Sequence, residues 1–190
     1  MKGRAIPRWA AAATMLLIAV SAFGQNAHDT RVISGVGYAF RVTAPSGWRF
    51  FDEDPQVNRR LGAYFLPITP QPASGWAIMR VTAVPRTASD APNVRAWVDA
   101  EIASIASTSQ PMALGVTELP RFPEDPPESI YIEYDDRMRR EYRAVAYLRD
   151  SGHMLITSLV CRESQVLQSM IPSLREVARS LHWVTSKFGR

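Results

Sequence analysis

The sequence predicts an antiparallel β-sheet with helices packed against it, and two patterns carry this prediction. The first is the stretch from Ser129 to Cys161, which reads SIYIEYDDRMRREYRAVAYLRDSGHMLITSLVC. It contains three runs rich in apolar, β-branched and aromatic residues, separated by one charged turn and one Ser-Gly turn, as in an antiparallel meander. The second is the helical spacing of apolar residues in two other segments, one before and one after the meander. We therefore expect the meander to form the centre of the sheet.

The middle run of this meander indicates what covers the sheet. Between Tyr142 and Arg149, apolar side chains occur at both odd and even positions. A strand that is covered on both faces gives this pattern. We expect helices on both faces of the sheet, or helices on one face and loops on the other.

The first 24 residues have the order of a secretory signal peptide. Three basic residues precede an apolar run over residues 9–20, and small residues follow up to Gly24. The run is shorter than the roughly 20 residues that a membrane-spanning helix needs, so we expect cleavage after Gly24. The alternative is a retained amino-terminal anchor. The only cysteine is Cys161, so a lipid-modified cysteine at the junction is not expected.

Removal of this leader would change the charge of the chain. The formal net charge is +4, from 22 basic and 18 acidic residues. Three basic residues and no acidic residue lie in the leader, so the mature chain would carry 19 basic against 18 acidic residues. A near-neutral chain does not favour a nucleic-acid partner. Its length suits one compact domain.

The amino-terminal half of the mature chain predicts a linker followed by strands. We expect a linker over residues 25–35, one domain over 36–184 and a tail over 185–190. Alternation and turn residues predict strands at Tyr38–Thr43, Trp48–Phe51, Ala63–Ile68 and Trp76–Val84, with a turn at Pro45–Trp48. These strands are expected to join the meander in one sheet. The acidic patch at residues 52–54 is interpreted as a solvated turn, because cation sites need ligands from several positions.

The segment from Asp90 to Ser107 predicts the first helix, with Asp90 as the N-cap. Apolar residues at spacings of three and four should face the sheet; they are Val94, Trp97, Val98, Ile102 and Ile105. We interpret Trp97 as a core residue, because it lies on this stripe.

Gln110–Glu128 is rich in proline, which cannot donate a main-chain hydrogen bond. We expect an extended surface connection with a short edge strand at Val116–Leu119. Long connections often carry function, so a binding rim is expected here.

The last helical pattern runs from Glu163 to Trp183 and is interrupted by Pro172. Two arrangements remain open. Either one helix ends near Met170 and a second begins at Pro172, or a single helix is kinked there.

The sequence contains no recognisable catalytic, metal-binding or cofactor-binding motif. His153 and Cys161 would lie about 26 Å apart on one strand, which excludes a thiol–imidazole pair. Cys161 ends an apolar strand and is expected to be buried. The carboxylates of the hairpin have arginines beside them, so charge compensation is the simpler interpretation than catalysis; they are Glu133, Asp135, Asp136 and Glu141.

The order of these motifs resembles the PsbP-like fold. The resemblance rests on Tyr38-x-Phe40, Pro45-x-Gly47-Trp48, a central helix, a Tyr-rich hairpin, the strand from His153 to Cys161, and a last helix ending Ser-Leu-His-Trp at residues 180–183. It implies an α+β domain whose antiparallel sheet, here of about six strands, is flanked by helices. It also implies a non-enzymatic accessory or binding role. No residue matches a functional motif of that family, so no site is carried over.

The expected function is therefore that of a periplasmic or secreted binding or accessory domain without a cofactor. Its partner would be a protein, a small molecule or a lipid, and the chain would be a monomer or a weak oligomer. The proline-rich connection and the charged hairpin tip, with Arg137, Arg139 and Arg140, are the expected contact surfaces. One alternative is a hydrolase-like enzyme with a dispersed site that gathers His153, Tyr142 or Glu133. Another is a structural role in an envelope assembly.

Overall fold

A computed structural model describes residues 29–35, 38–51, 62–69, 76–85, 93–108, 114–136, 140–150 and 153–184. The elements within these ranges are β1 (Thr30–Gly35), β2 (Tyr38–Thr43), β3 (Trp48–Phe50), β4 (Ala63–Pro67), β5 (Ala77–Pro85), α2 (Val94–Thr108), β6 (Leu114–Leu119), β7 (Ser129–Asp136), β8 (Glu141–Asp150), β9 (His153–Cys161), α3 (Ser164–Ser180) and β10 (His182–Trp183). The expected leader, the acidic patch at residues 52–54 and the tail lie outside the described residues.

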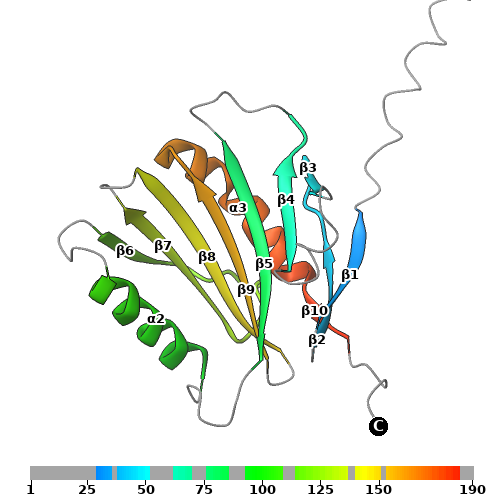
Figure 1. Cartoon of the computed structure of the whole chain (residues 1–190), viewed down its shortest axis with the longest axis horizontal. Helices are drawn as coiled ribbons and strands as arrows, with labels where there is room; N and C mark the ends of the chain where they lie inside the picture. The colour runs from blue at the N-terminus through cyan, green and yellow to red at the C-terminus, as the bar shows by residue number, and fades with distance from the viewer. Residues whose placement is uncertain are drawn as a thin grey trace, which may run out of the picture.

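The larger sheet has seven strands in the order β3-β4-β5-β9-β8-β7-β6, and the neighbouring strands are antiparallel (Figure 1). The predicted meander is confirmed as β7-β8-β9, and β9 occupies the middle of the order. The register runs from Ser129 opposite Leu148 to Asp150 opposite His153. The edge strand that was expected at Val116–Leu119 is β6, which is two residues longer.

The amino-terminal strands depart from the prediction, because β1, β2 and β10 form a separate three-stranded sheet. Tyr38–Thr43 was expected in the main sheet and is β2 of this smaller one. After β2 the chain turns through Gly47, which has a φ of 80°, and only then enters β3 of the larger sheet. Residues 30–35 were expected in a linker, but they form β1, because the β-branched residues Val32 and Ile33 lie in a run that pairs with β2 over its whole length.

The two helices cover opposite faces of the larger sheet, which confirms that the central strands are covered on both sides. Along β8, Ala144, Ala146 and Leu148 belong to one core cluster and Val145 and Tyr147 to the other, because successive side chains point to opposite faces. The first cluster includes the buried apolar residues of α3, and the second includes those of α2. Figure 1 shows α2 and α3 well separated around the sheet.

Both helices differ in detail from the sequence pattern. The first begins at Val94, and its N-cap is Asn93, whose Oδ1 accepts a hydrogen bond of 2.9 Å from the Ala96 N–H. The expected cap, Asp90, lies outside the described residues. The expected apolar stripe, Trp97 included, packs on the sheet. The second helix runs unbroken through Pro172, so the single-helix alternative holds.

Candidate functional site

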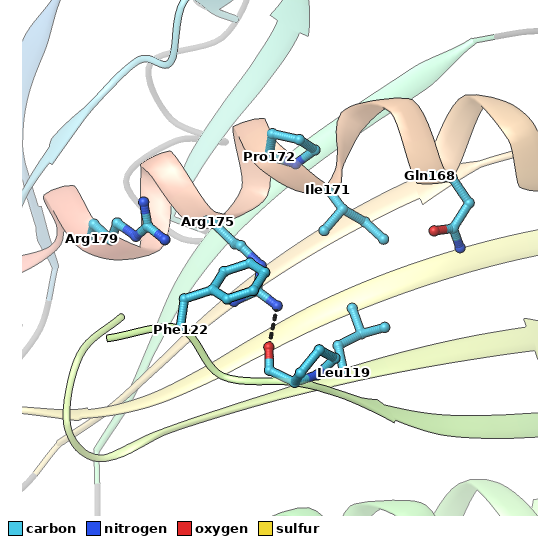
Figure 2. Close-up of a pocket in the computed structure, with 8 residues that line it drawn as sticks. Leu119, Phe122, Gln168, Ile171, Pro172, Arg175 and Arg179 are labelled. Atoms are coloured by element: carbon cyan, nitrogen blue, oxygen red, sulfur yellow. Dashed lines mark hydrogen bonds between the residues drawn. The ribbon is translucent and has the colours of Figure 1, made fainter. Parts of the chain in front are cut away.

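A hollow of about 460 Å³ lies between α3 and the proline-rich connection that joins β6 to β7 (Figure 2). We call it the α3 groove. Its lining residues are Leu119, Pro120, Phe122, Gln168, Ile171, Pro172, Arg175 and Arg179. Cavities of this size are typical of small-molecule sites. The structure therefore places a hollow against the connection where a binding rim was expected.

One stripe of α3 forms the long wall of the groove. Its residues recur at spacings of three and four, from Gln168 through Ile171, Pro172 and Arg175 to Arg179, and such residues share one helix face. Figure 2 shows Gln168 and Arg179 at opposite ends of the drawn stripe. At about 1.5 Å per residue, this wall is about 16 Å long.

A buried ion cluster fixes the proline-rich connection to α3. The side chain of Asp125 is 0% exposed, and it accepts hydrogen bonds from the Arg175 guanidinium, from Arg179 Nε at 3.0 Å and from the Phe122 N–H at 2.8 Å. Arg175 Nη2 also donates to the Pro120 carbonyl at 2.6 Å (Figure 2). Since buried charges are costly unless they are paired, these contacts hold the loop in one position.

Two aromatic rings enclose the Arg175 guanidinium. Its central carbon lies 4.3 Å from the centroids of both Phe122 and Tyr131, which is the geometry of a cation–π contact. Tyr131 is buried, and burial together with the nearby Asp125 charge raises the pKa of its hydroxyl to about 12. Phe122 is 46% exposed. The outer part of its ring is thus a fixed apolar wall of the α3 groove.

The ends of the groove differ in charge. Arg179 is partly exposed and lies 3.7 Å from the exposed carboxylate of Glu124. At the other end, Gln168 Nε2 donates to Glu133 Oε2 at 2.8 Å. The groove therefore runs from a basic end at Arg179 to a neutral, polar end at Gln168.

Of the residues expected at the hairpin tip, the structure describes Arg140, which does not line the α3 groove. Arg140 is exposed and has a φ of 50°, whereas Arg137 and Arg139 lie outside the described residues. The expected charge compensation is present at Glu141, whose Oε1 lies 2.6 Å from Arg143 Nη2.

His153 and Cys161 are both held within the fold. The ring of His153 stacks on Trp183 with centroids 3.6 Å apart, and the Trp183 N–H donates to Asp150 at 2.8 Å. Cys161 is fully buried, as expected, and burial raises the pKa of its thiol to about 12. His153 and Cys161 are the first and last residues of β9, so they do not meet.

The described ranges contain no group of three or more His, Cys, Asp or Glu residues that could hold a metal ion. None of their helices is long and apolar enough to cross a membrane.

The antiparallel sheet with a helix on each face defines an α+β domain. Among solved structures, the chain is similar to the solution structure of cyanobacterial PsbP (CyanoP) from Synechocystis sp. PCC 6803, with 14% sequence identity and a TM-score of 0.46 over 85% of this chain and 96% of that one. The likeness concerns the fold alone. No protein-family model matches the chain, and no curated protein matches it in sequence.

Proposed function

We propose that this chain is an exported, non-enzymatic binding domain and that the α3 groove holds its ligand. The observation that carries the proposal is the fixed apolar wall of Phe122. A large aromatic side chain that is half exposed and held in place over a buried arginine has little conformational freedom to lose when a ligand packs against it. Such preorganisation lowers the entropic cost of binding.

The buried ion cluster favours a binding role over a purely structural one. A buried ion pair contributes no more stability than well-packed apolar side chains of similar volume, because both charges must be desolvated. The Asp125–Arg175 pair does position the loop that carries Pro120 and Phe122. A rigid loop with an open apolar face suits recognition of a ligand.

An enzyme has less support than a binding domain, because the residues considered for a dispersed catalytic site do not gather at the groove. His153, Tyr142 and Glu133 do not line the α3 groove, and its lining is mainly apolar. Export is supported by the leader pattern of residues 1–24.

The groove is tested with a neutral apolar fluorophore such as Nile red. We expect the mature protein to bind the dye and the Ile171→Glu variant to lose at least tenfold in affinity, because a carboxylate would then lie in the apolar wall. The matched control is Ile68→Glu, since Ile68 is 59% exposed and does not line the groove. Far-ultraviolet circular dichroism verifies that both variants fold. Equal dye binding by Ile171→Glu and the unmodified protein would overturn the proposal.

Export is tested by fusing residues 1–24 to an alkaline phosphatase that is active only outside the cytoplasm. We expect activity from this fusion and none from a fusion that begins at residue 25, because only the former carries the leader. Equal activities would remove export from the proposal.

A further inference from the structure

We propose that the ligand of the α3 groove is a single-chain anionic amphiphile, with its carboxylate at Arg179 and its apolar chain along α3 toward Gln168. This inference rests on the proposed function and adds the chemical class of the ligand. Three properties of the groove support it: the small number of free main-chain donors along its middle, the charge at its basic end, and its length.

The walls favour an apolar chain over a peptide. A peptide needs hydrogen-bond partners for its main-chain groups, but Pro120 and Pro172 have no N–H to offer. The Phe122 N–H already donates to Asp125, and the Pro120 carbonyl already accepts from Arg175. The middle of the groove therefore offers contact area from Leu119, Phe122 and Ile171 and few free polar partners, which suits a hydrocarbon chain.

The basic end suits an anionic head group. Arg175 and Arg179 share the single buried carboxylate of Asp125, so these three side chains carry a net positive charge. The remaining counter-charge is Glu124, which is 67% exposed and 3.7 Å from Arg179. Exposed pairs of this kind contribute little. A ligand carboxylate can take the place of Glu124 at small cost.

Arg179 lies in the last turn of α3, where the helix dipole opposes an anion. Helical side chains lean toward the amino end of the helix. The guanidinium of Arg179 accordingly reaches back to Asp125, away from the last carbonyl groups. The head-group position is thus set by the ion cluster and not by the helix end.

The length of the α3 wall determines how long the hydrocarbon chain of the ligand can be. The stripe from Gln168 to Arg179 spans about 16 Å. Carbon–carbon bonds are about 1.5 Å and a staggered chain zigzags, so a saturated chain of about twelve carbons spans a similar length. Dodecanoate is therefore the probe of choice.

The experiment measures binding of dodecanoate, octanoate and dodecanol to the mature protein by calorimetry and by displacement of Nile red. We expect dodecanoate to bind at least tenfold more tightly than dodecanol, because a carboxylate accepts a charge-assisted hydrogen bond from the Arg179 guanidinium, which is stronger than a hydrogen bond between neutral groups. Octanoate should bind more weakly than dodecanoate, since it buries fewer methylene groups.

Two variants probe the head-group site. Arg179→Gln should lose dodecanoate affinity tenfold or more, and Glu124→Gln should raise it about two- to fivefold, because a competing carboxylate is removed. The increase cannot result from misfolding. The matched control is Glu128→Gln in the same loop, since Glu128 pairs with Arg149 and lines no part of the groove; it should leave the affinity unchanged.

The outcomes separate this inference from the proposed function. If dodecanol displaces the dye as well as dodecanoate does, or if Glu124→Gln has no effect, the anionic head group is wrong and the apolar binding role stands. If an extended apolar peptide with a free carboxyl terminus binds more tightly than dodecanoate, the ligand class is wrong. If the unmodified protein binds neither the dye nor either twelve-carbon compound, the proposed function fails as well.

Discussion

The two faces of the seven-stranded sheet are built in different ways. On the α2 face, apolar residues such as Val98, Ile132 and Met154 form the core, and the polar pair that we find in it is the Tyr134 and Tyr147 hydroxyls, 2.9 Å apart. On the α3 face, a buried carboxylate and a buried guanidinium accompany the apolar core. The α2 face thus depends mainly on packing and on a hydrogen bond between two tyrosines, whereas the α3 face also contains a buried ion pair between residues 50 positions apart.

Asp125→Ala should break the α3 face and give the largest loss of stability. It removes the carboxylate that compensates the buried Arg175, and breaking a buried ion pair costs about 3–5 kcal/mol. The free energy of unfolding is measured by urea denaturation. The double variant Asp125→Ala/Arg175→Met should recover much of the loss, because no buried charge then lacks a partner. A loss below about 1 kcal/mol in the single variant would contradict this account of the cluster.

Met154→Ala should weaken the α2 face by a smaller amount. Met154 is 1% exposed, and removing a buried Met side chain leaves a cavity that costs about 2–3 kcal/mol. The loss should be the same at low and high salt, since no charge is involved. If the stability loss of Met154→Ala depends strongly on salt, the α2 face also relies on charges and the proposed difference between the two faces is wrong.

Alkaline pH should destabilise both faces through their tyrosines. Burial raises the pKa of Tyr131 on the α3 face to about 12, and burial also raises the pKa of Tyr147 on the α2 face. An unfolded tyrosine ionises near pH 10, so the stability is fully present below about pH 10 and is lost as the pH rises toward about 12. Urea denaturation between about pH 9 and about pH 11 measures the loss. Tyr131→Phe and Tyr147→Phe should each make this alkaline loss of stability smaller. If neither variant reduces the loss, the two tyrosines are not its source.

The hairpin tip should contribute least to stability. Replacing Arg137, Arg139 and Arg140 by Ser should change the free energy of unfolding by no more than about 0.5 kcal/mol, because the sequence predicts a charged turn there and Arg140 is exposed. The same variant should capture less of a protein partner in a pull-down from its own host if the tip is a contact surface. Unchanged capture would count against the tip and leave the α3 groove unaffected.

Local patterns predicted most of the larger sheet and both helices. Alternation and turn residues between Ser129 and Cys161 identified three strands and their pairing, because neighbouring antiparallel strands need only a short turn. Helical spacing identified the stripe of α2 in the same way. The proline content of residues 110–128 pointed to a connection with a rim, and the α3 groove lies beside it.

The smaller sheet and the ion cluster depend on distant residues and could not be predicted in this way. β10 is two residues long and is defined by its pairing with β2, about 140 residues earlier. Asp125 and Arg175 are 50 residues apart. One signal was present in the sequence: Arg175 lies four residues after Ile171 and four before Arg179, on a helix whose other face is apolar. A stripe of two arginines beside apolar residues is a reason to search for a buried acidic partner.

The pairing of β10 with β2 also sets the order in which the domain can be completed. The Val184 N–H donates to the Ala39 carbonyl at 2.9 Å, so one edge of β2 is satisfied by residues near position 184. During synthesis, that edge stays open until these late residues have been made. The smaller sheet therefore closes only when nearly the whole described chain is present.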